Sequence, residues 1–280
     1  MAERVLVVVP TYNEKDNLAS AIARITASVP TAEILVVDDN SPDGTGLIAD
    51  RHALVDPRVH VLHRAAKEGL GAAYLEAFAW ALDRGYDVVV ECDADGSHQP
   101  EELPRLLAAL AGNDLVLGSR WVSGGRTVNW PLRRQLLSRA GSLYARVMLG
   151  LRQKDVTGGY RVFTSRALRA IDLATVTSQG YCFQIEMLWR ADRAGLRVVE
   201  SPITFIERAH GVSKMHGAIA IEALTRVTAW SVLPSRSGLS RSSARDGVLD
   251  RRADYLALSA QVGLDMAVAD RLIPDSNHER

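Results

Sequence analysis

Short apolar runs alternate along the first half of the chain with segments whose apolar residues recur at helical spacing. The runs cover residues 4–9, 33–37, 59–62, 88–92 and 115–118. They are rich in β-branched residues, which is typical of strands buried on both faces of a parallel sheet. Helices are predicted between them, over residues 17–25, 47–53, 70–82 and 100–110. This alternation predicts an α/β fold with a doubly wound, mostly parallel central sheet flanked by helices.

The second half of the chain follows a different pattern. A basic amphipathic helix is predicted over residues 132–149, a glycine-rich turn with the sequence TGGYRVF comes next, and another helix is predicted over residues 183–194. Residues 234–254 are rich in Ser, Arg and Gly and predict a flexible linker. Residues 255–280 form a tail with enough apolar residues for a helix. We therefore expect one domain over residues 1–233, followed by a short appendage.

Composition excludes some classes of function. The 33 Lys and Arg residues balance 33 Asp and Glu residues, so no net charge draws the protein to nucleic acid, and we expect no nucleic-acid partner. Cys92 and Cys182 lie in apolar segments without metal-ligand spacing, and we expect them to be buried thiols in a reducing compartment.

Neither a signal peptide nor a membrane-spanning helix is expected. The first residues, MAERVLVVVP, contain only a short apolar run and no small-residue cleavage pattern. A membrane-spanning helix needs roughly 20 consecutive apolar residues. The nearest segment, residues 218–233, is interrupted by Glu222 and Arg226. We expect a cytoplasmic protein that lies on the surface of any membrane it meets.

Asp93 and Asp95 follow the fourth apolar run, in the sequence ECDADGSHQP. Two carboxylates this close repel each other unless a cation lies between them. Mg²⁺ prefers one or two carboxylates together with substrate phosphates, so the pair is suited to hold the diphosphate of a nucleotide. The alternative is that these residues only cap the helix that begins near Pro100, because Asp and Ser are good cap residues.

Polar residues also end the first two apolar runs. The sequence VPTYNE places Pro10, Tyr12 and Glu14 after the first run, where a tyrosine can stack on a base and a glutamate can accept a hydrogen bond from it. The sequence VVDDNSPDGT places Asp38 and Asp39 after the second run, where one of them can face a base or ribose. Both clusters also fit ordinary capped turns. Because parallel strands end at the same edge of a sheet, all three clusters are expected to face one crevice.

Six motifs resemble a known family in their order and spacing over residues 4–230. They are VPTYNEKDNL, VVDDNSPDGT, KEGLGAA, DADGSHQP, GSRWVSGG with NWP, and ITFIERAHGVSK. Together they resemble the polyprenol-phosphate (dolichol-phosphate) mannosyltransferases of glycosyltransferase family 2. The resemblance implies a GT-A fold and a metal-dependent enzyme that transfers mannose from GDP-mannose to polyprenyl phosphate with inversion. It also implies a nucleotide-sugar and metal half over residues 1–125 and acceptor and interfacial elements over residues 126–233.

The resemblance assigns roles to individual residues. The implied nucleotide-sugar site consists of Pro10, Tyr12, Glu14, Val37, Asp39, Asp93, Ala94, Asp95, Arg120, Arg208 and Lys214. The implied metal ligands are Asp93 and Asp95, which would hold Mg²⁺ or Mn²⁺. The implied acceptor-phosphate residues are Arg134 and Ser138, and the implied catalytic residues are Asp95, Arg120, Arg134 and Arg208. Some relatives have a glutamine metal ligand at the position of Ser97, so Ser97 is not assigned to the metal shell.

The implied substrates determine the expected chemistry. A lipid phosphate is already an anionic nucleophile at neutral pH, so its attack on the sugar C1 needs no protein base. Catalysis is expected from alignment of two phosphate-bearing substrates and from charge stabilisation by the metal, Arg120 and Arg208.

Residues 132–149 are also a candidate interfacial helix. They combine Arg133, Arg134, Arg139 and Arg146 with Leu132, Leu136, Leu137, Leu143, Val147 and Met148. This mixture is expected of a helix that lies in a membrane surface, although a helix packed on the sheet with its arginines in water is the alternative. Residues 218–233 are a second candidate. We expect peripheral association with the cytoplasmic face of a membrane, and some relatives without their own membrane spans require a separate anchor protein.

Two alternative functions stay open. The same fold can serve a polyprenyl-phosphate glucose or aminosugar synthase that uses a UDP-sugar, and no single residue decides how the base is recognised. A catalytically silent nucleotide-sugar-binding protein is the other alternative. Arg208, Lys214 and the basic helix argue against it.

Overall fold

The computed structural model describes residues 3–178, 180–208 and 217–232, and the chain divides into two compact units, residues 1–220 and 221–280. The strands of the first unit are β1 (Val5–Thr11), β2 (Glu33–Asp38), β3 (Val59–His63), β4 (Val88–Glu91), β5 (Leu115–Ser119), β6 (Arg126–Val128), β7 (Arg161–Thr164), β8 (Val198–Pro202) and β9 (Thr204–Ile206). Its helices are α1 (Leu18–Ser28), α2 (Thr45–Val55), α3 (Leu70–Asp83), α4 (Leu103–Ala109), α5 (Leu132–Leu149), α6 (Ser165–Ala170) and α7 (Gly180–Arg193), with single 3-10 turns η1 (Pro100–Glu102) and η2 (Leu173–Thr175). Helix α8 (Gly217–Ser231) starts in the first unit and continues into the second.

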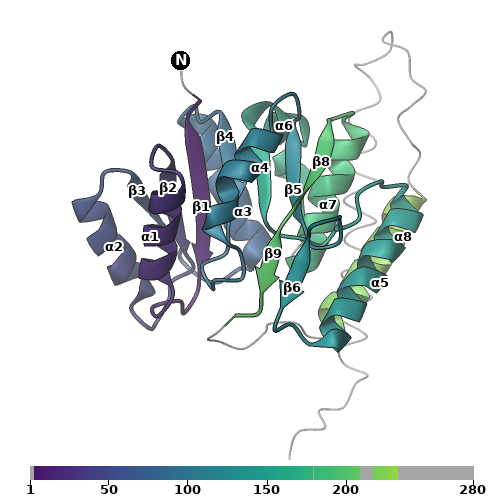
Figure 1. Ribbon diagram of the computed structural model, residues 1–280, viewed down its shortest axis with the longest axis horizontal. Helices are drawn as coiled ribbons and strands as arrows, with labels where there is room; N and C mark the ends of the chain where they lie inside the picture. The colour runs from purple at the N-terminus through teal and green to yellow at the C-terminus, as the bar shows by residue number, and fades with distance from the viewer. Residues whose placement is uncertain (1–2, 179, 209–216, 233–280) are drawn as a thin grey trace, which may run out of the picture. The chain divides into compact units, whose positions relative to one another are not determined.

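Seven strands form the central sheet in the order β3-β2-β1-β4-β7-β5-β8 (Figure 1). Strand β1 pairs in parallel with β2 and β4, β2 pairs in parallel with β3, and β5 pairs in parallel with β8. Strand β7 is antiparallel to both of its neighbours, β4 and β5. A separate pair of parallel strands is formed by β6 and β9. The prediction of a mostly parallel α/β sheet is therefore confirmed.

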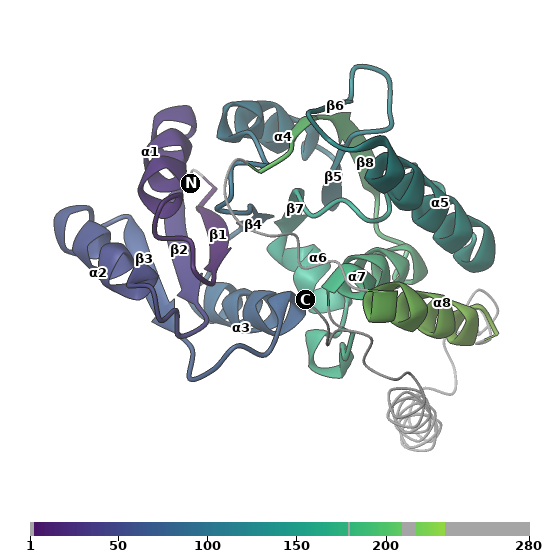
Figure 2. The ribbon, with the colours of Figure 1, turned by 90° about the horizontal axis from the view of Figure 1, so that it is seen from below.

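Helices cover both faces of the sheet (Figure 2). Helices α1, α2 and α4 lie on one face, and α3 and α7 lie on the other. On the second face, the rings of Phe78 in α3 and Phe163 in β7 have centroids 5.6 Å apart. Strands covered on both sides need apolar residues at every position, which explains the continuous apolar runs in the sequence.

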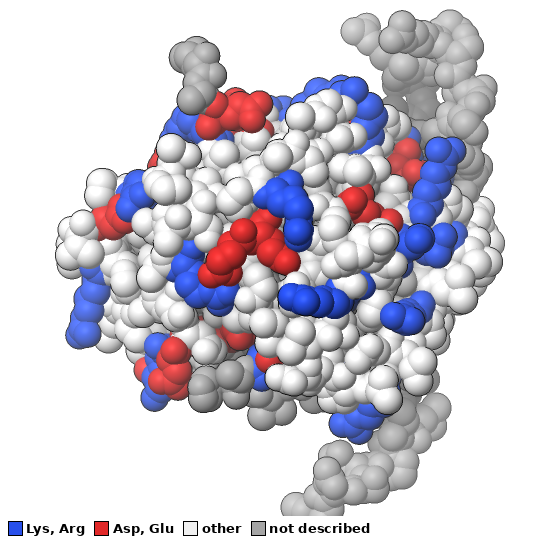
Figure 3. All heavy atoms as spheres, viewed as in Figure 1, with Lys and Arg blue, Asp and Glu red and all other residues white. Residues whose placement is uncertain are grey.

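Helix α5 leaves a row of apolar side chains exposed. Leu132, Leu136, Leu143 and Val147 follow one another at helical spacing and are all exposed. Arginine side chains are spaced along the same helix with uncharged surface between them (Figure 3). The helix begins and ends as the sequence predicts.

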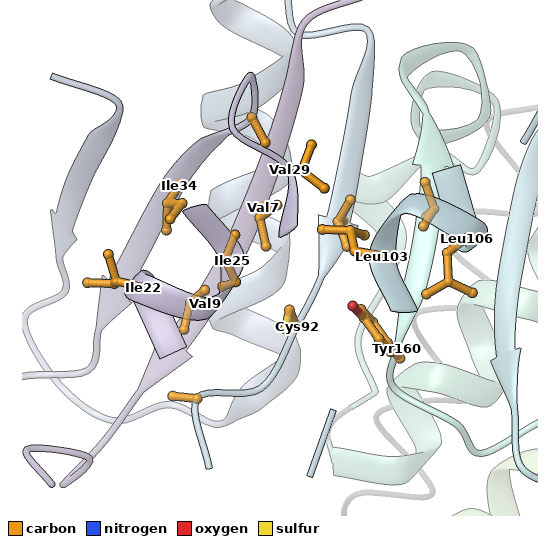
Figure 4. Close-up of a cluster of buried hydrophobic side chains, with 14 of the residues drawn as sticks. Val7, Val9, Ile22, Ile25, Val29, Ile34, Cys92, Leu103, Leu106 and Tyr160 are labelled. Atoms are coloured by element: carbon orange, nitrogen blue, oxygen red, sulfur yellow. The ribbon is translucent and has the colours of Figure 1, made fainter. Parts of the chain in front are cut away.

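The core beneath the first face joins β1 to its covering helices (Figure 4). Val7 of β1 is fully buried, as are Ile25 of α1 and Leu103 of α4. Cys92 belongs to the same cluster, and both cysteines are buried thiols, as predicted. This core fixes the loops that follow β1 and β4.

Strand β7 is where the predicted elements are wrong. The sequence TGGYRVF is a turn only in its first part, because Arg161–Thr164 enters the sheet between β4 and β5. Arg161 is fully buried and pairs with Glu91 across the β4–β7 register. A four-residue strand that starts with a charged residue has no apolar periodicity to distinguish it from a loop.

Some predictions concern residues outside the described part of the chain. They include the linker over residues 234–254 and the tail over residues 255–280, and the proposed limits of the catalytic domain stay a prediction. Across the described ranges, none of the helices combines the length and apolar character that crossing a membrane requires.

Candidate active site

The three acidic clusters meet at one edge of the sheet. Strands β1, β2 and β4 are parallel, so they end at the same edge, and the antiparallel β7 begins there. The backbone N–H of Asp39 donates to the carbonyl of Thr11 at 3.0 Å, and the N–H of Cys92 donates to the carbonyl of Val8 at 3.0 Å. The loops after these strands are thus held side by side, as the sequence predicts.

Asp95 is held by a backbone group of its own loop and lies beside the guanidinium of Arg208. Its Oδ1 accepts from the backbone N–H of Ser97 at 3.0 Å, and its Oδ2 lies 3.3 Å from Nη2 of Arg208. Ser97 is buried in this loop. Ala94, which separates the two aspartates, is also buried, so its side chain belongs to the core and not to the ligand side.

Asp93 has two neighbours that the sequence does not single out. The Tyr74 hydroxyl donates to its Oδ1 at 3.5 Å, and Nε2 of His98 lies 3.9 Å from its Oδ2. Burial raises the pKa of Asp93, His98 opposes the shift, and the nearby charge of Asp95 adds to it. Burial also raises the pKa of Tyr74, so its phenol stays protonated and remains a donor. The aspartate pair therefore needs positive charge.

His98 connects the aspartate loop to Tyr160. Its Nδ1 accepts from the backbone N–H of Asp93 at 3.0 Å, so in the neutral ring the proton lies on Nε2, the atom that faces the Asp93 carboxylate. Its ring stacks on Tyr160 with the centroids 4.7 Å apart. Such histidines commonly orient a carboxylate that binds a metal.

The aspartate pair fits a divalent cation by its chemistry. Among the described residues, no group of three or more His, Cys, Asp or Glu side chains is arranged to hold a metal ion. A cation held by Asp93 and Asp95 would therefore complete its coordination with water and with phosphate oxygens of a substrate, as Mg²⁺ usually does. The donor set suits a cation that arrives together with a diphosphate.

Asp39 is held by a buried arginine. Nη1 of Arg64 lies 2.6 Å from Oδ1 of Asp39, and the two side chains are only 4% and 8% exposed. Arg64 also contacts Glu76 at 2.8 Å and Glu68 at 2.6 Å. Burial raises the pKa of Asp39, and the Arg64 guanidinium opposes the shift. Arg64 is not among the residues predicted from the sequence. Its position directly after β3, at a strand end, is the feature that could have identified it.

Asp38 has a structural role. Its carboxylate accepts from the Thr11 hydroxyl at 3.0 Å and from the Ser41 backbone and hydroxyl at 3.0 and 2.6 Å. The capped-turn interpretation therefore holds for Asp38. Of the two adjacent aspartates, Asp39 is the one that lies beside Arg64.

Tyr12 and Glu14 lie at the end of β1. The Lys67 ammonium lies 4.0 Å from the centroid of the Tyr12 ring, a cation–π distance. The Glu14 carboxylate accepts from the side-chain amide of Asn17 at 2.8 Å, and the Glu14 N–H donates to the Thr45 hydroxyl at 2.9 Å. Glu14 thus serves the turn into α1, and a contact with a base would add to that role.

Pro10 and Val37 are partners in the β1–β2 register. Pro10 is partly exposed, whereas the side chain of Val37 is completely buried. In this conformation, only the backbone of Val37 is suited to contact a nucleotide, and its predicted role stays a prediction.

Arg120 is enclosed beside helix α5. Its Nε and Nη2 donate to the two oxygens of Asp155 at 2.7 and 2.6 Å, and Nη2 also lies 3.3 Å from the Ser138 hydroxyl. Asp155 is fully buried and was not singled out by the sequence. The structure therefore brings Arg120 and Ser138 together, but the charge of Arg120 is already neutralised by a carboxylate.

Arg134 and Arg208 are linked through one carboxylate. Nη1 of Arg134 lies 2.5 Å from Oε2 of Glu207, and Nε of Arg208 lies 3.9 Å from Oε1 of the same residue. Glu207 lies within the motif ITFIERAHGVSK, but the sequence assigns it no role, because a glutamate beside an arginine is common on surfaces. Lys214 lies outside the described residues.

Comparisons with known proteins find a matching family and similar sequences. Residues 6–172 match the model of glycosyl transferase family 2. The chain is 56% identical over 236 residues to the undecaprenyl-phosphate mannosyltransferase of Micrococcus luteus, covering 84% of this chain and 97% of that protein. It is 55% identical over 232 residues to the polyprenol monophosphomannose synthase of Mycolicibacterium smegmatis, covering 82% and 88% of the two chains.

A solved structure shares the fold. Glucosyl-3-phosphoglycerate synthase from Mycobacterium tuberculosis, in complex with Mn²⁺, uridine-diphosphate-glucose and phosphoglyceric acid, superposes with a TM-score of 0.63 at 21% sequence identity. The match covers 84% of this chain and 82% of that one. The predicted GT-A fold is confirmed.

Proposed function

The chain belongs to glycosyl transferase family 2, and we propose that it transfers mannose from GDP-mannose to polyprenyl phosphate with inversion, giving polyprenyl-phosphate mannose. Two relatives that are 55% and 56% identical, and are named for this sugar and this class of lipid, support mannose and a polyprenyl acceptor. The structural observation that carries the proposal is the meeting of the aspartate pair, Asp93 and Asp95, with Asp39 on one side and Arg134 on the other. The donor nucleotide is the finer part of the proposal.

The nucleoside would lie against Asp39 and Tyr12. Guanine presents adjacent N–H donors, and an ionised carboxylate is a pure acceptor, so Asp39 is suited to them. Arg64 keeps that carboxylate ionised by pairing with one of its oxygens. Tyr12 offers a ring for stacking, and Lys67 above it adds positive charge near the phosphates.

The diphosphate would lie against Asp93 and Asp95 together with Mg²⁺ or Mn²⁺. When bound there, a divalent cation neutralises the charge on the departing diphosphate. The Tyr74 hydroxyl hydrogen-bonds the Asp93 side chain, His98 fixes the Asp93 backbone, and the Ser97 N–H fixes the Asp95 carboxylate. The Arg208 guanidinium, 3.3 Å from Asp95, supplies further positive charge beside the leaving group.

The acceptor phosphate would be held from α5. Arg134 and Ser138 are one helical turn apart on this helix, so both can face the same phosphate group. The phosphate oxygen attacks the sugar C1 from the side opposite the diphosphate, which inverts the anomeric centre. No protein base is needed because the nucleophile is already an anion. The buried Arg120–Asp155 pair positions Ser138.

We infer that the exposed row on α5 contacts the membrane that carries the lipid acceptor. Leu136 and Leu143 are 67% and 57% exposed on this helix, and the exposed Arg133 and Arg139 lie beside them. Apolar side chains flanked by arginines match the acyl and headgroup layers of an anionic surface. Binding to protein-free vesicles would make a separate anchor protein unnecessary.

A transfer assay tests the proposal. Purified protein is incubated with a polyprenyl phosphate, Mg²⁺ or Mn²⁺, and either GDP-mannose or UDP-glucose, each labelled in the sugar, and label in the lipid phase is followed. We expect transfer from GDP-mannose only, and we expect chelation of the metal to stop it. Transfer from UDP-glucose alone would contradict the donor, and binding of GDP-mannose without any transfer would favour a catalytically silent protein.

A further inference from the structure

Four charged side chains alternate in sign between the metal-binding aspartates and the acceptor helix. Asp95 lies 3.3 Å from Arg208, Arg208 lies 3.9 Å from one oxygen of Glu207, and the other oxygen of Glu207 lies 2.5 Å from Arg134. The two arginines are assigned to different substrates, the donor and the acceptor. Glu207 is therefore the carboxylate that both arginines share.

The backbone around Glu207 is held from two sides. The N–H of Glu207 donates to the carbonyl of Val128 in β6 at 3.0 Å, and the N–H of Ile206 donates to the carbonyl of Ser97 in the aspartate loop at 3.2 Å. The side chains of Glu207 and Arg134 are only 20% and 16% exposed. The carboxylate thus occupies a fixed and partly buried position between the two substrate sites.

Arg134 has unused donor capacity. Its Nη1 is paired with Glu207, but its Nε is buried and has no hydrogen-bond partner among the described residues. A guanidinium presents a fork of donors that matches the oxygens of a carboxylate or phosphate in pairs. The contact with Glu207 engages only part of this fork, so a group with more acceptor oxygens would satisfy Arg134 better.

We propose that Glu207 is a placeholder for the acceptor phosphate. Without acceptor, Glu207 compensates the charge of Arg134, and an arriving phosphate monoester takes its place on the guanidinium. The displaced carboxylate is not left unpaired, because Arg208 already lies beside its other oxygen. Glu207 therefore competes with the acceptor and sets the acceptor concentration at which the enzyme works. This inference rests on the proposed function.

The substitution Glu207→Gln tests the placeholder. It removes the competing charge at nearly constant volume, so we expect the KM for a short-chain prenyl phosphate to fall about two- to fivefold, the range expected for one partly exposed ion pair. The KM for GDP-mannose should change less than twofold. Calorimetric titration with the prenyl phosphate alone should show the same tightening without turnover. A residue that only orients Arg134 would instead weaken acceptor binding when it is replaced.

Two controls separate this mechanism from a general effect of charge. Glu101→Gln removes a carboxylate that pairs with Arg24 and should leave the acceptor KM unchanged. In an Arg134→Gln background, Glu207→Gln should have no further effect on acceptor binding, because the two residues act as a pair. If Glu207→Gln does not fold, Glu207→Asp, which withdraws the carboxylate by one methylene, should lower the KM in the same direction.

An unchanged or higher acceptor KM in folded Glu207→Gln protein would overturn the placeholder while leaving the proposed function intact. A wild-type protein that transfers no mannose from GDP-mannose to prenyl phosphate would overturn the proposed function itself.

Discussion

Replacing Arg64 with methionine should damage nucleotide binding through a residue that need not touch the nucleotide. Arg64 pairs with Asp39 at 2.6 Å, and both side chains are almost completely buried. Removing one partner of a buried ion pair typically costs about 3 to 5 kcal/mol, because the other charge is left uncompensated. The contacts with Glu68 and Glu76 add little, because those carboxylates are exposed.

The cost should appear as protonation of Asp39. Burial already raises the pKa of Asp39, and Arg64 opposes the shift, so its loss raises the pKa further. A protonated Asp39 can no longer accept two hydrogen bonds from a base. A hydrogen bond to a charged group is worth about 1.5 to 3 kcal/mol, which corresponds to roughly a 10- to 100-fold weaker Kd for GDP.

Calorimetric titration with GDP and Mn²⁺ measures this effect directly. An acid whose pKa is raised regains its charge as the pH rises, so Arg64→Met should recover affinity as the pH is raised, whereas the affinity of the wild type should change less. Glu76→Gln is the matched control, since it removes a partner of Arg64 and leaves the pair with Asp39 in place. Folded Arg64→Met protein with wild-type GDP affinity at pH 7 would refute the reasoning.

Three further predictions concern the metal, the pH dependence of stability and the membrane. Asp95→Ala should abolish transfer and Mn²⁺ binding, measured by lipid-phase counting and by electron paramagnetic resonance. Glu33→Gln should lower the free energy of unfolding by about 1 kcal/mol at pH 7. Burial raises the pKa of Glu33, but Tyr86, His60 and Arg4 lower it more, so the difference should shrink as the pH falls below the usual glutamate pKa. Leu136→Gln with Leu143→Gln should reduce sedimentation with anionic vesicles about tenfold or more.

Each of these three predictions can be contradicted by a specific outcome. Near-normal turnover of Asp95→Ala would remove the metal assignment. A constant difference in stability from pH 3 to pH 7 would mean that the charge of Glu33 is not what stabilises the fold. Leu54→Gln, at an 85% exposed leucine on α2, is the control for the membrane prediction, and an equal loss of vesicle binding in that variant would show that α5 has no special role.

The sequence predicts most of the sheet because a strand that is buried on both faces is apolar at nearly every position. Strands β1, β2, β4 and β5 are buried along almost their whole length, so each appears as a largely apolar run. Strand β3 lies at the edge of the sheet, is only partly buried and contains two histidines. Strand β7 escapes prediction because it carries Arg161, whose guanidinium is satisfied inside the protein by three backbone carbonyls. A buried arginine is indistinguishable in sequence from an exposed one.

The sequence predicts the aspartates of the site but not the side chains that hold them. Asp39, Asp93 and Asp95 stand at strand ends, and strand ends can be located from the apolar runs. Arg64, the partner of Asp39, comes from another segment, and only tertiary structure brings the two within contact distance. His98 lies in the same loop as Asp93, but only the fold of that loop turns its ring toward the carboxylate. Arg64 also follows a strand, β3, so its position at a strand end could have marked it as a site residue. Nothing in the spacing of residues marks His98 in this way.

Because β7 lies between β4 and β5, the first and second halves of the chain both contribute strands to one sheet. Both strands that flank β5 come from later in the chain, at residues 161–164 and 198–202. A nascent polypeptide leaving the ribosome therefore cannot complete the sheet until about residue 202 has emerged. The residues proposed to bind the nucleotide and those proposed to bind the lipid are consequently not carried by exchangeable modules. A chimera joined near residue 125 would have to build one sheet from β1–β5 of one parent and β7 and β8 of the other.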